Sequence, residues 1–262
     1  MITHLLYDGT FQGLLTCIFE IYERKLWQAD IVKPKRFQPE LNGTSRTIDT
    51  ESAKSKRVWN GLSRKVSVSK RDQVYQTFLS ELPEMERLIT AFVKHVFSND
   101  GNVEEDLGHP AVIGVTKIAH QVHREKHRME AFIRFQRTKE DLYFAAIEPD
   151  FNVLPLIASH FKDRYADQRW LIYDQRRKYG ITYDAQTTNV SEVLLDLDRN
   201  SLGEFLPASM CHEDEIQYQK LWKDYFCSVN IGTRRNTKLH VRHVPTRYWR
   251  YLTEKKDFSH GQ

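Results

Sequence analysis

Cysteine is scarce in this sequence, which has only Cys17, Cys211 and Cys227 among its 262 residues. Disulfide frameworks, zinc sites and iron–sulfur sites need cysteines at short, paired spacings, and these three are scattered along the chain. We therefore expect reduced thiols, no bound metal and no cofactor.

Long apolar runs are missing as well. No stretch reaches the roughly 18 apolar residues that a membrane-spanning helix needs. The opening MITHLLYDGT has no basic segment before an apolar one and no small-residue cleavage site, so a secretory signal is not expected. Hydrophobic residues make up 40% of the chain and charged residues 28%, as in a globular protein that buries a hydrophobic core. We expect a cytoplasmic protein with no membrane partner.

The familiar catalytic motifs are also absent. The sequence contains no glycine-rich phosphate loop, no nucleophile elbow, no kinase motif set and no dinucleotide-binding fingerprint. Conventional nucleotide-hydrolysing chemistry therefore has no support in the sequence.

Charge is present but unevenly distributed, although the net charge is only +4. Residues 33–71 hold eleven Lys and Arg against three acids, a net of +8, and residues 231–250 hold six Lys and Arg without an acid, a net of +6. Residues 191–215 hold seven acids against one Arg, a net of −6. This segmentation indicates that one face of the protein meets a polyanion while another does not.

The hydrophobic periodicity predicts an α+β fold with a mainly antiparallel central sheet flanked by helices. A strand, a turn and an amphipathic helix open the chain, and further helices are expected between about residues 49 and 100. A helix after Pro110 ends in HREKHR, and a period of two then predicts a strand over 129–136. Parallel doubly wound architecture is less favoured because most strand connections look short. We expect one domain, 1–262, with a helical insertion at about 49–100. The later elements are expected as strands at 143–147, 169–173, 180–183 and 189–195 and helices at 153–165 and 214–229.

Three histidines, His120, His123 and His127, recur on one face of the helix after Pro110. A metal site would need further ligands, and neither H-E-x-x-H nor a cysteine pair accompanies them. We favour a polar or phosphate-facing helix surface over metal binding.

Three carboxylates, Glu130, Glu148 and Asp174, lie near predicted strands and close to arginines. Such a cluster could bind a divalent cation in a nuclease, since Mg²⁺ prefers oxygen ligands. We favour the simpler interpretation, in which they form ion pairs with the neighbouring arginines.

The segment TRRNTKLHVRHVPTRYWRYL joins arginines, histidines and aromatic residues without an acid. Guanidinium groups match phosphate oxygens and aromatic faces stack on unpaired bases, so DNA or RNA fits both features. For the aromatic residues we favour the alternative, in which Tyr248, Trp249 and Leu252 pin a C-terminal helix to the core, and for the arginines we favour contact with a polyanion. The predicted nucleic-acid-binding residues are Arg234, Arg235, Lys238, His240, Arg242, His243 and Arg247.

Four segments together resemble the bacterial family called probable DNA metabolism proteins, over about residues 3–28 and 108–253. They are LLYDGTFQGLLTCIFEIYERK, HREKHRMEAFIRFQR, YFAAIEPDFNVLPLIASHFKDRYADQRWLIYDQRR and TRRNTKLHVRHVPTRYWRYLTEK. The resemblance implies a domain of unknown function in DNA repair or modification, encoded beside a radical-SAM protein and elsewhere fused to a uracil-DNA-glycosylase-like domain. Its recurring positions correspond to His127, Arg128, Met129, Phe135, Glu148, Pro149, His160, Phe161, Arg164, Trp170, Asp174, Pro245, Tyr248 and Trp249. The chain has no radical-SAM cysteine motif and no glycosylase domain, so we expect another chain to supply either activity.

Three hypotheses follow. The favoured one is an accessory DNA-binding protein that works with a radical-SAM partner. The second is an enzyme acting on DNA or a modified nucleotide, with His127, Glu148, His160 and Asp174 as candidate catalytic groups. The third is a protein-binding adaptor, which an exposed apolar patch and indifference to nucleic acid would distinguish.

Overall fold

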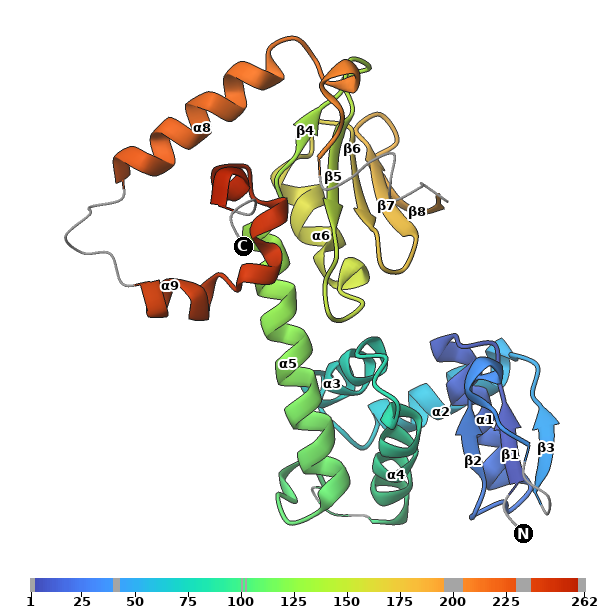
Figure 1. Cartoon of the computed structure of the whole chain (residues 1–262). Coiled ribbons are helices and arrows are strands. Elements are labelled where there is room, and N and C mark those ends of the chain that lie inside the picture. Colours follow the sequence, from blue (N-terminus) through green and yellow to red (C-terminus); the bar gives the residue numbers. More distant parts are fainter. Residues whose placement is uncertain are drawn as a thin grey trace. The chain divides into compact units, whose positions relative to one another are not determined.

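The computed structural model describes residues 3–39, 43–99, 101, 103–195, 205–229 and 237–258. They divide into two compact units, residues 1–123 and 124–262, and the boundary falls inside helix α5 (Pro110–Phe132) (Figure 1). The predicted single domain with a helical insertion stays a prediction.

Unit 1 begins with a three-stranded parallel sheet. Strand β1 (Thr3–Leu6) lies between β2 (Asp30–Val32) and β3 (Thr44–Thr47) and pairs in parallel with both. Helix α1 (Phe11–Glu23) connects β1 to β2, and the Thr10 side chain caps it by accepting the Gly13 N–H. The first predicted strand, turn and helix are therefore confirmed.

Three further helices complete the core of unit 1 within the stretch predicted as helical. They are α2 (Ser52–Ser63), α3 (Val68–Leu79) and α4 (Met85–Ser98). Short 3-10 turns lie at Pro34–Arg36 and Val103–Glu105. The apolar positions of the three helices recur every three or four residues, as in Ile89, Phe92 and Val96 of α4, which are all fully buried.

Unit 2 is built on a five-stranded sheet of order β4-β5-β6-β7-β8. The strands are β4 (Gln136–Arg137), β5 (Tyr143–Ile147), β6 (Trp170–Asp174), β7 (Tyr179–Asp184) and β8 (Asn189–Leu194), and helix α6 (Leu154–Arg164) lies between β5 and β6 in the chain. Strands β5 and β6 pair in parallel, whereas the pairs β4–β5, β6–β7 and β7–β8 are antiparallel.

The α+β class is confirmed, but the mainly antiparallel central sheet is wrong. The described strands form one parallel sheet and one mixed sheet, whose central strand β6 pairs in parallel with β5 and antiparallel with β7. In each unit a helix follows one strand and carries the chain back to the end at which the next strand starts, which gives parallel neighbours. The connections β4–β5, β6–β7 and β7–β8 are short and join antiparallel neighbours, as expected, whereas the longer connection from β5 to β6 runs through α6 and joins parallel ones.

The strand predicted at 129–136 is also wrong for most of its length. Helix α5 continues to Phe132, with Val122, Glu125 and Met129 buried at helical spacing, and only Gln136 and Arg137 join the sheet. The alternating apolar residues that suggested a strand are also compatible with the buried face of a helix, so periodicity over so short a window was ambiguous.

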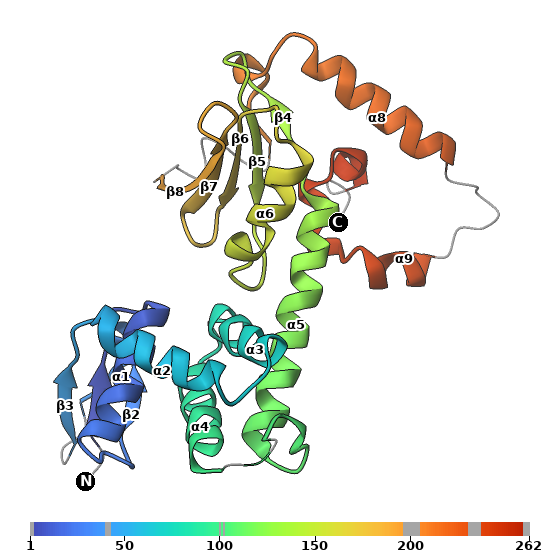
Figure 2. The same cartoon turned by 180° about the vertical axis from the view of Figure 1, so that it is seen from behind.

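The C-terminal part of unit 2 is helical. It contains α8 (Glu215–Val229), α9 (Thr237–His243) and 3-10 turns at Ala208–Met210, Thr246–Tyr251 and Thr253–Phe258. Both views show α8 extending away from the five-stranded sheet (Figures 1 and 2). Across the described parts of the chain, no helix has the length and apolar character that crossing a bilayer requires.

Candidate functional site

The last turns of α5 place a carboxylate between two imidazoles. Glu130 is mostly buried, and its Oε2 lies 3.1 Å from His127 Nδ1 on the same helix. Its Oε1 lies 4.0 Å from Nδ1 of His160, which α6 contributes, and 3.2 Å from Lys126 Nζ. Two of the predicted catalytic residues, His127 and His160, are thus brought to one carboxylate.

Helix α6 presents His160 and Arg164 because its other face is buried. Leu154, Ile157 and Phe161 recur at helical spacing in the core, which leaves positions 160 and 164 at the edge of the helix. The exposed Arg164 donates from Nε to the Tyr165 hydroxyl at 3.3 Å, and its guanidinium carbon lies 5.7 Å from the centre of that ring. No carboxylate of the described residues forms an ion pair with Arg164.

These side chains open into a cavity of about 1100 Å³ that lies wholly within unit 2. Its walls come from the end of α5, from β4 and β5, from α6 and from α8. The lining residues are His127, Glu130, Ala131, Ile133, Arg134, Phe135, Arg137, Tyr143, His160, Phe161, Arg164, Tyr165, Gln168, Glu215, Tyr218, Gln219, Leu221, Trp222, Tyr225 and Thr253. Cationic, imidazole and aromatic groups therefore share one space.

Helix α8 contributes a stripe of apolar side chains that remain exposed. Tyr218, Leu221, Trp222 and Tyr225 are 60%, 55%, 39% and 58% exposed, and all four line the cavity. Their spacing of three and four residues places them on one face of the helix. This wall offers exposed aromatic surface, although the Arg134 guanidinium carbon lies 5.3 Å from the centre of the Trp222 ring.

One arginine of the cavity is held in place by a carboxylate. Arg134 donates from Nη2 to Glu254 Oε1 at 2.8 Å and from Nε to Oε2 at 3.3 Å, while Trp222 Nε1 donates to the same Oε2 at 2.8 Å. Burial raises the pKa of Glu254, but these hydrogen bonds and the charge of Arg134 outweigh it and hold the pKa below its usual value. Through Trp222, these hydrogen bonds tie α8 to Glu254 in the 3-10 turn Thr253–Phe258.

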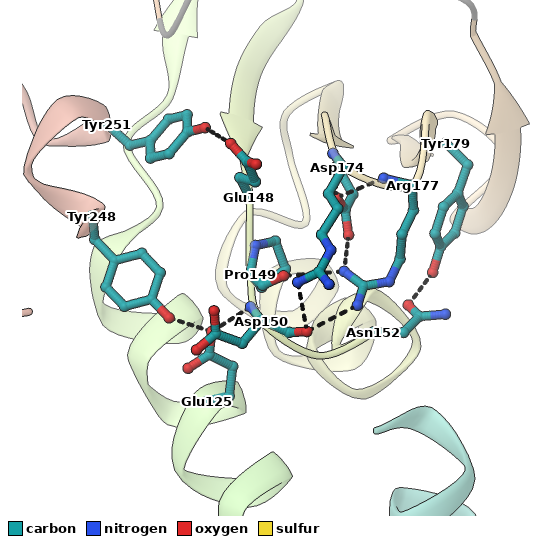
Figure 3. Close-up of polar contacts among 11 residues, drawn as sticks. Glu125, Glu148, Pro149, Asp150, Asn152, Asp174, Arg177, Tyr179, Tyr248 and Tyr251 are labelled. Atoms are coloured by element: carbon teal, nitrogen blue, oxygen red, sulfur yellow. Dashed lines mark hydrogen bonds and ion pairs between the residues drawn. The ribbon is translucent and has the colours of Figure 1, made fainter. Parts of the chain in front are cut away.

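The other two predicted catalytic residues lie elsewhere and have structural partners (Figure 3). Glu148, which follows β5, accepts the Tyr251 hydroxyl at 2.9 Å and forms an ion pair with Arg250. Asp174, at the end of β6, is fully buried and accepts from Arg177 Nη1 at 2.8 Å. Neither lines the cavity, so the four predicted catalytic residues do not all converge.

Asp174 organises the β6–β7 turn. It also accepts the backbone N–H groups of Arg176 at 2.9 Å and Arg177 at 3.1 Å. Arg177 in turn donates to the carbonyl oxygens of Pro149 at 3.1 Å and Asp150 at 3.2 Å (Figure 3). Burial raises the pKa of Asp174, and the neighbouring Arg177 opposes that rise. The ion-pair interpretation of this carboxylate is confirmed.

Comparison with known proteins identifies a family. Residues 83–254 match the model of DUF4130, a domain of unknown function. The chain belongs to the DUF4130 family. No curated protein matches it. Among solved structures it is similar to the pGpG-specific phosphodiesterase PggH from Vibrio cholerae, with 11% identity, a TM-score of 0.32 and coverage of 87% of this chain and 99% of the other. A TM-score this low carries no argument about fold or function.

All residues that line the large cavity fall inside the DUF4130 match.

The structure describes five of the seven predicted nucleic-acid-binding residues. Arg234 and Arg235 lie outside the described residues. Lys238, Arg242 and His243 are exposed on α9, whereas the half-buried His240 ring lies 6.0 Å from Trp249.

Arg247 of the DUF4130 domain is engaged within the chain. It forms ion pairs with Asp150 at 2.7 Å and Glu125 at 3.7 Å, and its guanidinium carbon lies 4.6 Å from the centre of the Tyr248 ring. Tyr248 is itself buried and donates its hydroxyl to Glu125 (Figure 3). The alternative in which the C-terminal aromatics anchor the segment is confirmed for Tyr248.

Sequence reasoning missed most of the cavity wall of this DUF4130 domain. Tyr218, Trp222 and Tyr225 belong to a correctly predicted helix, but nothing in the pattern showed that their face stays open. Glu130 was noted as a carboxylate, and only the fold sets it between two histidines. Across the described residues, no group of three His, Cys, Asp or Glu side chains could hold a metal ion.

Proposed function

We propose that this DUF4130 chain is a nucleic-acid-binding accessory protein in DNA repair or modification, working with a radical-SAM partner. The observation that carries nucleic-acid binding is the convergence of cationic and aromatic side chains in one cavity of about 1100 Å³. Arginine forks match phosphate oxygens, and every base has a face that can stack on an aromatic ring. The pathway and the radical-SAM partner rest on the sequence resemblance alone.

Within this proposal each wall has a different task. Arg164 contacts a phosphate, since its guanidinium is exposed at the rim of α6. Trp222 and Tyr225 of α8 stack on an unpaired base, and base–aromatic stacking contributes about 1–3 kcal/mol per base. Lys238 and Arg242 on α9 neutralise further phosphates. A single strand fits this arrangement better than a duplex, because only unpaired bases expose both faces.

Fluorescence anisotropy with labelled single- and double-stranded DNA of the same sequence tests the proposal. We expect Arg164→Glu to weaken single-strand binding at least tenfold. Arg169→Glu is the matched control, because Arg169 is exposed in the same unit and does not line the cavity. Equal losses in both variants would refute the cavity as the binding site, and no binding of wild type at low salt would favour the adaptor hypothesis.

A second candidate function, an enzyme acting on DNA or a modified nucleotide, is favoured by the His127–Glu130–His160 arrangement. One imidazole can accept a proton from an attacking water while the other donates a proton to a leaving oxygen. Glu130 would orient the His127 ring, whose Nδ1 is 3.1 Å from the carboxylate. Glu148 and Asp174 have no part in this version.

Incubation with end-labelled oligonucleotides, followed by denaturing electrophoresis, tests for phosphodiester cleavage. Turnover that His127→Gln and His160→Gln each reduce at least 100-fold would support the enzyme. His120→Gln is the control, because His120 is exposed on α5 and lies outside the cavity lining. Turnover that survives both substitutions would argue against these residues.

A further inference from the structure

A second, smaller cavity of about 350 Å³ lies within unit 1 and has no role in the proposed function. The parallel register pairs His4 of β1 with Asp30 of β2, so both side chains leave the same face of the sheet. Helix α4 supplies Arg87, Thr90 and Lys94, which recur at spacings of three and four on one helix face. A sheet face and a helix face thus line this cavity together.

The side chain at the sheet face is a buried histidine without a partner. His4 is only 9% exposed, and neither of its ring nitrogens has a hydrogen-bond partner within the described part of the chain. The centre of the His4 ring lies 5.4 Å from that of Phe37, so the phenyl ring packs against the imidazole but gives its nitrogens no hydrogen bond. Buried polar groups nearly always have a partner, because leaving one unpaired is costly. The unpaired ring points to an occupant of the cavity toward which His4 turns to make the missing hydrogen bond, because both nitrogens are shielded as the ring lies here.

The charges around the cavity favour an anionic occupant. Lys94 Nζ donates to the Trp27 carbonyl at 2.8 Å, which leaves two of its three N–H donors for another acceptor. Burial lowers the pKa of Lys94, because it disfavours the charged ammonium group. Arg87 pairs with Asp30 at 3.2 Å, so two cations face one carboxylate.

We propose that this cavity binds a small molecule carrying a phosphoryl or carboxylate group, held by His4 and Lys94. Charge-assisted hydrogen bonds to oxyanions are among the strongest that proteins form. The volume lies in the range of small-ligand sites, and the half-exposed Trp27 offers a flat apolar surface at the rim for the rest of the molecule. This proposal does not rest on the nucleic-acid binding proposed for unit 2.

Titration of the full-length, ¹⁵N-histidine-labelled protein with inorganic phosphate and, separately, with succinate tests the proposal. We expect a saturable shift of the His4 ring nitrogens with at least one anion and a matching rise in Tm. Lys94→Gln should weaken binding at least tenfold, whereas Lys117→Gln, which changes an exposed lysine of the same unit, should leave it unchanged. A response to phosphate alone assigns a phosphoryl ligand, and a response to succinate alone assigns a carboxylate.

His4→Phe provides a second, independent arm. The substitution removes two nitrogens that make no hydrogen bond within the described chain, so the variant should fold with an unchanged or higher Tm and lose the anion-induced rise. The proposal is overturned if neither anion shifts the His4 resonances saturably, which would indicate a hydrated cavity only. It is equally overturned if Lys94→Gln binds as tightly as wild type.

Discussion

At the scale of single residues, buried carboxylates rather than catalytic groups account for much of the polar chemistry of unit 2. Glu125 is 1% exposed and accepts hydrogen bonds from the Tyr248 hydroxyl and, at 2.9 Å, from the Asp150 N–H. Arg128 and Arg247 neutralise it from 3.4 and 3.7 Å. A buried carboxylate is tolerated only when its oxygens are satisfied in this way.

The hydrogen bond from Tyr248 to Glu125 predicts that removing the Tyr248 hydroxyl destabilises the protein. Tyr248→Phe leaves an oxygen of Glu125 with one hydrogen bond fewer, so we expect the free energy of unfolding to fall by about 1.5–3 kcal/mol, the range for hydrogen bonds to charged groups. Urea denaturation followed by circular dichroism measures the change. Tyr218→Phe is the control, since Tyr218 is 60% exposed, and its change should stay within about 0.5 kcal/mol. Equal effects of the two substitutions would contradict the network.

The lowered pKa of Glu254 predicts how the stability of the protein changes in acid. Its folded pKa lies below its unfolded value, so its stabilising contribution is fully present above the unfolded pKa and is lost as pH falls through the folded pKa. Glu254→Gln should therefore cost about 2 kcal/mol at neutral pH, because hydrogen bonds to charged groups contribute that much. The difference from wild type should shrink below about pH 4, the usual range of glutamate. Urea denaturation at several pH values measures it, and a difference that is independent of pH would be inconsistent with the shift.

At the scale of elements, the periodicity predicted helices well and strand pairing poorly. Strand β5 and helices α6 and α8 lie within one residue of the predicted ends, because each has a clear buried or apolar pattern of its own. Pairing depends on which strands meet after the intervening helix packs, and no local pattern encodes that. The same limit applies to the site. His127 and His160 were candidates by residue type, but their meeting at Glu130 needed the packing of α6 near the end of α5.

Helix α8 depends on its first residue. Glu215 is 7% exposed, accepts the Arg137 N–H at 3.0 Å and accepts from Gln219 Nε2 at 2.9 Å. Glu215→Ala removes this anchor to β4, so we expect amide hydrogen exchange in α8 to speed up about tenfold or more, while exchange in β5 and β6 stays unchanged. Exchange followed by mass spectrometry measures both. The exposed Glu213 gives the control, Glu213→Ala, and equal acceleration in the two variants would show that Glu215 is no anchor.

At the scale of the whole molecule, two basic segments compete for the role of polyanion contact. Residues 33–71 carry a net charge of +8 and residues 231–250 carry +6, yet only the second segment belongs to the same unit as the large cavity. Net charge alone would attract DNA to either segment. Local contact and general attraction can therefore be separated by making the same charge change in each segment.

Lys238→Glu/Arg242→Glu and Lys56→Glu/Arg64→Glu reverse two exposed cations each, one pair in each basic segment. If α9 contacts phosphates, binding of the first variant should neutralise two fewer phosphates and so release fewer counterions. Its slope of log K against log salt for single-stranded DNA should become shallower by about 1.4. The second variant should keep the wild-type slope, because Lys56 and Arg64 contact no phosphate in this proposal and only contacted phosphates set the slope. Anisotropy over a salt series from 50 to about 300 mM measures both slopes. Equal flattening in the two variants would mean that the whole basic surface, and not α9, attracts the strand.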